Sequence, residues 1–507
     1  MDSVSRYISA LNDTKSHLAH QYIKNQSNFP SMEGTQDIIG REIEQSVLTE
    51  CIASSQPEFI AVYGRRRIGK TFLIKQFFKN KFDFYLTGVY DSNLSESLEL
   101  FNTQLEKFSG RMWPKANSWL KAFGQLENYL SSLKKNKVVV FIDELPWLDT
   151  PRSRFIRALE FFWNSWGDSQ TNLKFIVCGS ATTWMTDKLI GDKGGLHNRV
   201  TRKIYLAPFN LHDTERLLKA KGIKWNRHQI IDCYMVVGGT PFYLSKMNRS
   251  QSLAQNVDRL FFHHEGELRE EYEFLFRSLF KDSTIYRRIV ELLAKKAIGM
   301  TRDNIISSLK VADGGKLSEA LRNLIKCDFI REYKAFGKKE RNRLYQLTDL
   351  FTLFYLKFVK DNRSEDEGFW LSQVNTPSQN SWSGYAFEQV CLHHIRQIKK
   401  ALGIAGVATE TSSWIGMTDG KKTGQIDLII DRKDETINLC EMKYSRKDYD
   451  ITPLYMKNLF ERMENFREAT KTKKALHLTM VTVNGVVHNA QWNDIQNEVT
   501  ADDLFQR

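Results

Sequence analysis

The stretch Gly64-Arg65-Arg66-Arg67-Ile68-Gly69-Lys70-Thr71 fits the phosphate-loop pattern G-x-x-x-x-G-K-[ST] at every fixed position. Residues 59–63 before it form an apolar run typical of a buried strand, and residues 72–78 after it have apolar side chains at helical spacing. A strand, a glycine loop and a helix N-terminus together direct backbone N–H groups and a positive dipole end toward one point. We therefore expect an anion site here, against the alternative of a chance glycine–lysine turn before a helix.

Each residue of this loop has an expected part in binding ATP and Mg²⁺. Lys70 is expected to reach the β and γ phosphates, and the Thr71 hydroxyl is expected to be a magnesium ligand. The remaining residues of the predicted nucleotide site are Gly64, Arg65, Arg66, Arg67, Ile68, Gly69 and Phe72.

The second strong signal is the run 137–144, in which an apolar strand ends in Asp143 and Glu144. An acid at the end of a buried strand can hold Mg²⁺, and the next acid can orient and deprotonate the attacking water. An acidic turn can follow any buried strand, but this one lies about 70 residues beyond a phosphate loop. We therefore predict Asp143 as a metal ligand and Glu144 as the catalytic base.

Two further polar positions are candidates for the same reaction. The apolar run 173–178 leads into Ser180, which can sense the γ-phosphate, although Gly-Ser is also ordinary loop chemistry. Arg199 or Arg202 can stabilise transition-state charge on the nucleotide of a neighbouring copy, which would require a homo-oligomer. A surface salt bridge is the alternative for these arginines.

Alternating strands and helices predict an α/β fold, with a parallel sheet that has helices on both faces. The expected organisation has six parts. These are a lead-in at 1–35, a P-loop ATPase core at 36–212, a helical lid at 213–282, a winged helix at 283–362, a linker at 363–383 and a nuclease-like α/β domain at 384–507.

Basic residues are concentrated in one part of this 507-residue chain, whose formal net charge is +13. Residues 283–363 contain 18 Lys and Arg against 9 Asp and Glu, whereas residues 381–507 contain 17 of each. A local basic excess is typical of a nucleic-acid-binding module, although it can also serve solubility.

This basic segment has the pattern of a winged helix. Three helical stretches, at 284–294, 301–309 and 316–326, precede two strand-like runs. The third stretch would be the recognition helix, and basic residues would form a wing that contacts DNA phosphates. The wing residues are Lys338, Lys339, Arg341 and Arg343. Alternatively, the winged helix only packs against the ATPase.

The last segment holds a second set of charged residues. Asp427 and Glu441 lie on two apolar strands, and Lys443 shares a strand face with Glu441. Carboxylates are natural Mg²⁺ ligands, and the lysine can position a water or stabilise phosphate charge, with Glu388 from the preceding helix completing the set. A buried ion pair is the alternative explanation of this D-x(13)-E-x-K spacing.

The cysteines and the hydropathy indicate a cytoplasmic protein. The six cysteines form no C-x-x-C pair and are expected to be reduced core thiols. No apolar run reaches the roughly 18 residues needed to span a membrane, so no membrane partner is expected, and the N-terminus lacks the blocks of a secretory signal.

Several stretches together resemble one family, the archaeal-type P-loop ATPases found in archaea and bacteria. The stretches are 63–71, 141–144, 178–181, 238–244 and 344–359. The family belongs to the additional-strand catalytic-glutamate division, close to the AAA+ and signal-transduction NTPases. Its members commonly end in a restriction-endonuclease-like PD-(D/E)XK domain.

The resemblance covers residues 35–480 and implies the same site residues as the patterns above. Lys70 and Thr71 match the phosphate loop, and Asp143 and Glu144 match the acidic pair. The nuclease core would be Glu388, Asp427, Glu441 and Lys443. The leading Pro-Asp of the nuclease motif is replaced here by Ile426-Asp427, which retains the metal ligand.

The resulting hypothesis is an ATPase that binds DNA and couples its nucleotide state to a Mg²⁺-dependent nuclease-like domain. The alternative is an ATP-gated regulatory protein whose C-terminal domain is a catalytically inactive binding module. Both hypotheses require the same ATP site.

Overall fold

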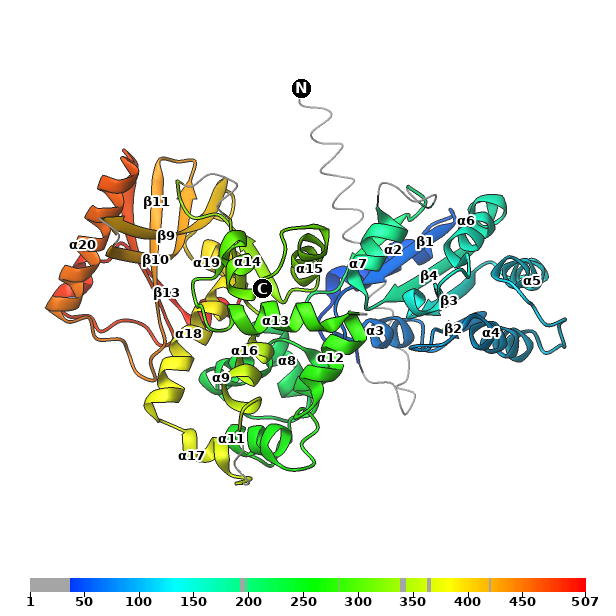
Figure 1. Cartoon of the computed structure of the whole chain (residues 1–507), viewed down its shortest axis with the longest axis horizontal. Helices are drawn as coiled ribbons and strands as arrows, with labels where there is room; N and C mark the ends of the chain where they lie inside the picture. The colour runs from blue at the N-terminus through cyan, green and yellow to red at the C-terminus, as the bar shows by residue number, and fades with distance from the viewer. Residues whose placement is uncertain are drawn as a thin grey trace. The chain divides into compact units, whose positions relative to one another are not determined.

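The computed structural model describes residues 37–191, 196, 198–280, 282–337, 343–362, 366–418 and 421–507 (Figure 1). These residues form two compact units. The first contains the described residues up to Tyr63 with Lys70–Gly179 and Met185–Tyr205, and the second contains Gly64–Gly69, Ser180–Trp184 and Leu206–Arg507. The expected lead-in at 1–35 lies outside the described residues.

The first unit is built on a five-stranded sheet in the order β2-β3-β4-β1-β5. All of its strand pairs are parallel, and runs of Val, Ile and Phe fill strands buried on both faces. This arrangement confirms the predicted α/β fold class. The strands are β1 (Glu58–Tyr63), β2 (Phe84–Thr87), β3 (Val138–Asp143), β4 (Leu173–Gly179) and β5 (Arg202–Tyr205).

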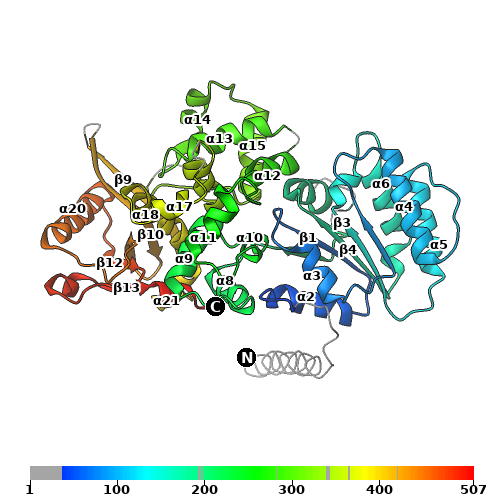
Figure 2. The same cartoon turned by 90° about the horizontal axis from the view of Figure 1, so that it is seen from below.

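Helices cover both faces of this sheet (Figure 2). On one face lie α2 (Glu42–Ala53) and α3 (Lys70–Phe77), and on the other lie α4 (Leu94–Ser109), α5 (Trp119–Ser131) and α6 (Phe155–Ser165). Aromatic side chains join α6 to the sheet. The ring centroids of Phe59 and Trp163 are 4.8 Å apart, and those of Phe162 and Phe175 are 5.7 Å apart.

The second unit begins with helices and continues through a small sheet. The helices are α8 (Leu211–Ala220), α9 (Arg227–Val237), α10 (Pro241–Ser245), α11 (Leu253–Val257) and α12 (Glu271–Leu279). Next come α13 (Ser283–Leu293), β6 (Met300–Thr301), α14 (Arg302–Leu309), α15 (Gly315–Lys326) and an antiparallel hairpin of β7 (Ile330–Tyr333) and β8 (Leu344–Leu347). The three strands pair in the order β6-β8-β7.

The segment expected to be a linker, residues 363–383, differs from the prediction over its described part. It contains α17 (Phe369–Gln373) and the start of α18 (Pro377–His393). Trp370 is buried, and its ring packs edge-on against Phe354 of α16 (Leu350–Phe354) and against Trp382. Apolar burial by these tryptophans offsets the cost of ordering a polar segment, so this stretch belongs to the core.

The C-terminal sheet has the order β13-β12-β11-β10-β9. Its strands are β9 (Thr409–Thr418), β10 (Lys421–Arg432), β11 (Thr436–Lys443), β12 (Ala475–Thr482) and β13 (Asn497–Thr500). The first three pair antiparallel and the last three pair parallel. Helices α18 and α20 (Pro453–Thr470) lie on opposite faces (Figure 1). This separate mixed sheet also agrees with the predicted fold class.

One hydrophobic core runs through the second unit from Phe209 to Phe505. Two smaller apolar clusters lie separately in the C-terminal domain, around Phe466 and around Met480. The large core includes residues of the expected lid, winged helix and nuclease-like domain, which it joins. The reason is the aromatic run of α16 and the following η6 (Tyr355–Val359), of which most side chains are buried.

The cysteines and the helices bear on two composition-based expectations. All six cysteines are free and buried. Within the described ranges, no helix combines the length and the apolar character needed to cross a bilayer.

Candidate functional site

The phosphate loop connects β1 directly to α3, and its backbone is strained in the way such loops require. Gly64, Arg67 and Gly69 have φ angles of 142°, 74° and 87°. A Cβ added at Gly64 would lie 2.4 Å from the Leu206 carbonyl oxygen and 2.6 Å from Ile68 Cδ1. Glycine is therefore required at this position both by the backbone angle and by the close approach of Leu206 and Ile68.

The first unit brings Thr71 and Asp143 together across 72 residues of sequence. Thr71 Oγ1 donates to Asp143, at 3.1 Å from Oδ1 and 2.9 Å from Oδ2. Asp143 also accepts from the Glu144 backbone N–H at 3.0 Å and from the Cys178 thiol. A hydroxyl and a carboxylate are the oxygen ligands that Mg²⁺ prefers, so this pair fits the metal expected from the sequence.

The other predicted ATPase residues have the following surroundings. Lys70 begins α3 and is buried, and Glu144 has a left-handed backbone with φ 47° at the end of β3. Ser180 follows β4 and is buried. Arg199 is exposed, and its Nη1 lies 3.6 Å from Asp168 Oδ2.

Arg202 pairs weakly with Glu58, since Nη2 and Oε1 are 3.9 Å apart. Both arginines named as finger candidates therefore take part in ion pairs of the kind that the sequence left open as the alternative.

Two arginines of the loop make contacts that the sequence did not predict. Arg65 is buried, and its Nη1 lies 2.5 Å from Asp349 Oδ1. Arg67 donates to Glu271 through Nε at 2.9 Å and through Nη2 at 3.0 Å. The partner residues lie 284 and 204 positions further along the chain. No local pattern marks such distant partners, although Asp349 lies inside the quoted stretch 344–359.

The second candidate site lies on the C-terminal sheet. The antiparallel register pairs Leu428 with Cys440, so Asp427 and Glu441 are the next residues on two neighbouring strands. Burial, followed by the charge of Asp427, raises the pKa of Glu388 on α18 to about 8. Burial also raises the pKa of Asp427, with the charge of Glu441 adding to it. The structure thus places the predicted acids within electrostatic reach of one another.

Glu441 is held by three neighbours, of which two were not predicted. Its oxygens lie 2.8 Å from Lys443 Nζ and 2.9 Å from Arg462 Nη1, and it accepts a hydrogen bond from the Tyr455 hydroxyl. Burial disfavours the charge of Glu441, but Lys443 and Arg462 overcome this effect and lower its pKa. Tyr455 and Arg462 lie seven residues apart on α20, which puts them on one helix face.

The hairpin of β7 and β8 reaches the same acids. Arg331, Tyr333 and Gln346 line a small cavity of about 20 Å³ together with Glu388 and Asp427. Within the described residues, no group of three His, Cys, Asp or Glu side chains is close enough to hold a metal ion. The acids therefore converge without forming a finished ligand shell.

The expected wing can be followed only in part. Lys338, Lys339 and Arg341 lie outside the described residues. Arg343 is exposed, and its Nη1 lies 2.7 Å from Glu332 Oε2.

The hairpin also contacts the edge of the C-terminal sheet just before the undescribed residues. The Phe336 N–H donates to the Ser413 carbonyl oxygen of β9 at 2.7 Å, and the Phe336 ring lies 5.0 Å from that of Phe466. The expected winged-helix segment also contacts the phosphate loop through Asp349 and Phe329, which is the kind of contact that the alternative expected.

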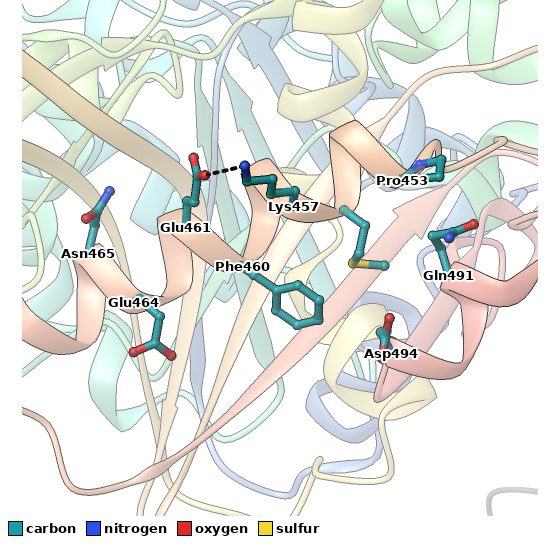
Figure 3. A pocket seen from close by; sticks show the side chains of 9 residues that line it. Pro453, Lys457, Phe460, Glu461, Glu464, Asn465, Gln491 and Asp494 are labelled. Carbon is teal, nitrogen blue, oxygen red and sulfur yellow. Dashed lines mark ion pairs between the residues drawn. The ribbon is translucent and has the colours of Figure 1, made fainter.

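A larger pocket of about 610 Å³ lies along the outer side of α20 (Figure 3). Phe460 and Asp494 line it, and Lys457 pairs with Glu461 across one helical turn at 3.9 Å. None of the four predicted nuclease residues lines this pocket. We assign it no part in the predicted chemistry.

The chain matches two family models and one curated relative. Residues 39–247 match an ATPase domain predominantly from Archaea, and residues 355–463 match a family of archaeal and bacterial proteins of unknown function. An uncharacterised protein of Methanocaldococcus jannaschii is 26% identical over 430 residues, which are 82% of this chain and 90% of that protein.

Two solved structures are similar at low identity. A Walker-type ATPase of Pyrococcus abyssi has a TM-score of 0.45 and 19% identity, over 64% of this chain and 97% of that chain. The ORC2 protein of Aeropyrum pernix, solved in ADPNP and ADP complexes, has a TM-score of 0.39 and 15% identity, over 65% of this chain and 94% of that chain.

The family model covers the phosphate loop, Asp143 and Glu144, and the second match covers Glu388, Asp427, Glu441 and Lys443 without assigning them an activity. The resemblance stated from the sequence is confirmed. Residues 39–247 are similar to the ATPase domains that are found predominantly in Archaea.

Proposed function

We propose that this chain binds and hydrolyses ATP with Lys70, Thr71, Asp143 and Glu144. The observation that carries the proposal is the meeting of Thr71 and Asp143, whose oxygens lie within 3.1 Å of each other. These two residues would hold Mg²⁺, which supplies charge neutralisation at the phosphates when bound.

The other site residues would have separate roles in ATP hydrolysis. Lys70 offsets negative charge on the β and γ phosphates, and Glu144 accepts the proton of the attacking water. Ser180 would sense the γ-phosphate. Arg199 would act on the nucleotide of a neighbouring copy, which requires a homo-oligomer and the release of its pair with Asp168.

Point variants test the ATPase proposal directly. We expect Lys70→Ala to abolish nucleotide binding and Glu144→Gln to retain ATP while hydrolysis falls about 1,000-fold. Lys75→Ala is the matched control, because Lys75 lies on the same helix and contacts the Tyr85 ring instead of the loop. Binding of a fluorescent ATP analogue and phosphate release would both be measured. Wild-type turnover in Glu144→Gln would contradict the assigned base.

We also propose that residues 283–362 act as a winged helix that binds DNA. The element order, with α15 exposing Lys316 and Arg322, supports this reading. So does a surface pocket of about 340 Å³ lined by Arg331, Lys334 and Arg343 of the hairpin. Basic side chains of this kind suit contacts with the phosphates of a nucleic acid, although Glu332, which pairs with Arg343, lines the same pocket.

The basic pocket and the acidic cavity share Arg331 and Tyr333 as lining residues. A strand bound in the pocket would therefore have a phosphate beside Glu388 and Asp427. This neighbourhood supports a Mg²⁺-dependent nuclease, in which Asp427, Glu441 and Glu388 would hold the metal after moving closer together than they are in this structure. Lys443 would stabilise the developing phosphate charge.

DNA binding is tested by the salt dependence of affinity. Replacing Lys334 and Arg343 with Gln should weaken binding to a fluorescent duplex and reduce the salt slope by roughly one for each lost phosphate contact. Lys473→Gln, at an exposed lysine elsewhere in the second unit, is the control. An unchanged slope in the double variant would exclude this pocket as the DNA site.

A second candidate function is favoured by the contacts of Glu441. Its oxygens already pair with Lys443, Arg462 and Tyr455, which is the arrangement of a buried ion cluster in a binding module without catalysis. In that case the C-terminal domain would bind DNA or a protein under the control of ATP.

Plasmid cleavage with Mg²⁺ or Mn²⁺, with and without ATP, separates the two candidates. A nuclease should cleave as wild type and lose cleavage in Asp427→Ala and Lys443→Ala, while Lys457→Ala, on the exposed side of α20, should cleave normally. No cleavage by the wild-type protein under any nucleotide condition would favour the binding module.

A further inference from the structure

The phosphate loop is held from outside the ATPase domain by two carboxylates. Arg65 and Arg67 occupy variable positions of the loop, where the sequence pattern sets no residue type. Their partners, Asp349 and Glu271, lie in neither of the two segments that match known families. All four residues belong to the second unit.

The contact between Asp349 and Arg65 is buried, and both oxygens of the Asp349 carboxylate accept hydrogen bonds. Asp349 Oδ1 lies 2.5 Å from Arg65 Nη1, and Oδ2 accepts from the Thr352 N–H at 3.0 Å and from the Thr352 hydroxyl. The Arg65 guanidinium also lies 5.1 Å from the centroid of the Phe329 ring. Because Asp349 caps the N-terminus of α16, its carboxylate is fixed by the helix before it meets the loop.

The contact between Glu271 and Arg67 consists of two hydrogen bonds, and the backbone of Arg67 is held by a further one. The fork of Arg67 donates to both carboxylate oxygens, which is the strongest geometry for such a pair. The Arg67 guanidinium lies 4.0 Å from the centroid of the Phe242 ring, and the Phe242 N–H donates to the Arg67 carbonyl oxygen at 3.3 Å. The Tyr243 hydroxyl donates to Glu271 at 3.2 Å.

These contacts bear on the shape of the loop because Arg67 has a φ of 74°. A non-glycine residue in the left-handed region persists only when its surroundings determine the conformation. Phosphate binding by backbone N–H groups depends on that conformation, since the groups must point to one place before the nucleotide arrives. Residues that hold Arg65 and Arg67 therefore act on nucleotide affinity.

We propose that Asp349 and Glu271 are positioning residues of the ATP site, which keep the phosphate loop in its nucleotide-binding shape. The proposal rests on the proposed nucleotide site of this chain. Asp349 lies 279 positions beyond Lys70 in the sequence. The ATP site therefore depends on α12 and on the segment after the hairpin.

The test compares Glu271→Gln and Asp349→Asn with wild type in the full chain. We expect the Kd for a fluorescent ATP analogue and the KM for ATP to rise about tenfold, with kcat changing less than twofold. Glu273→Gln is the matched control, because Glu273 lies on the same helix and pairs with Arg287, away from the loop. It should bind ATP as wild type does.

A double-variant cycle shows whether the effect passes through the arginine. In an Arg67→Gln background, Glu271→Gln should cause no further loss of affinity. If Asp349→Asn does not fold, Arg65→Lys takes its place, since it keeps the positive charge opposite Asp349 and removes the guanidinium contact. Wild-type affinity in a folded Glu271→Gln, accompanied only by a lower Tm, would overturn the proposal. Failure of the wild-type chain to bind ATP would instead refute the proposed nucleotide site.

Discussion

At the scale of single residues, the carboxylate of Asp143 shows how the first unit prepares an oxygen ligand. It takes hydrogen bonds from Thr71, from the Glu144 backbone and from the Cys178 thiol. Burial and the charge of Asp143 raise the pKa of Cys178 well above its usual value, so the thiol stays neutral and remains a donor. The carboxylate is thereby oriented by three hydrogen-bond donors.

Sequence patterns predicted Asp143 and Thr71 because a phosphate loop and an acid-ended strand have fixed local spacing. They did not predict that Arg462 and Tyr455 contact Glu441. These two residues lie on a helix and Glu441 lies on a strand, so no local sequence pattern marks the contact. Glu388, in contrast, was predicted as an acid on the helix that precedes these strands, and it lines the same cavity as Asp427.

Glu388 gives a prediction of pH-dependent stability. Its pKa is raised to about 8, from an ordinary value of 4.5, chiefly by burial and by Asp427. The folded protein therefore holds a proton that the unfolded chain releases between those two values, so stability falls as the pH rises from about 4.5 to 8. Glu388→Gln removes this loss, and above pH 8 we expect it to stabilise the second unit by about 1–2 kcal/mol, with no gain at pH 4.

The measurement is the Tm at pH 4 and at pH 8.5, with Glu464→Gln, at an exposed carboxylate on α20, as the control. A gain for Glu388→Gln that is equal at both pH values would show that titration of Glu388 is not its cause.

At the scale of elements, the turn between β1 and α3 depends on Gly64. Its φ of 142° is rarely adopted by residues with a side chain, and Leu206 O and Ile68 Cδ1 leave no room for a methyl group. Periodicity and the loop pattern predicted this strand, loop and helix. The helices at 369–373 and 377–383 were not predicted, because the flanking Gly, Pro, Ser and Asn residues are typical of a linker. In the structure, Pro377 lies in the first turn of α18, directly after the N-cap residue Thr376, where a helix accepts proline.

Gly64→Ala should remove ATP binding and destabilise the chain by about 2–4 kcal/mol, because both the backbone angle and the close contacts oppose a Cβ. Gly124→Ala is the matched control. Gly124 lies inside α5 with nothing within 4 Å of an added Cβ, so the same change should stabilise by about 0.5–1 kcal/mol. Calorimetric Tm and ATP-analogue binding would be measured. Retained affinity in Gly64→Ala would mean that the loop tolerates a different shape.

At the scale of the whole molecule, the described residues form two compact units. The alternation of strands and helices predicted the parallel sheet, and the resemblance implied an α/β C-terminal domain. Neither predicted the large core that joins the lid, the hairpin segment and one part of the C-terminal domain. Which apolar side chains share a core depends on the tertiary structure. The sequence alone therefore did not show that the aromatic run after Asp349 connects several parts of the chain. Its rings connect several parts: Phe351 stacks on Tyr243 at 4.7 Å and packs near Phe261 at 5.9 Å.

Two core phenylalanines test this division. Phe351→Ala should destabilise the second unit by about 3–5 kcal/mol, and Phe101→Ala should do the same to the first, since both side chains are fully buried. We expect calorimetry to show that each variant lowers a different thermal transition. A single transition lowered equally by both substitutions would contradict two separately cooperative units.

The contact of Phe336 with β9 has a consequence for how this protein can be divided. β9 is an outer strand of its sheet, and an outer strand offers unpaired amides to which other polypeptides can add. The Phe336 N–H and the Ala335–Ser413 bridge occupy part of that margin. A shortened protein that began after the hairpin would expose the unpaired edge of β9 and would be prone to form intermolecular sheets. The hairpin and the C-terminal sheet are therefore best expressed and engineered together.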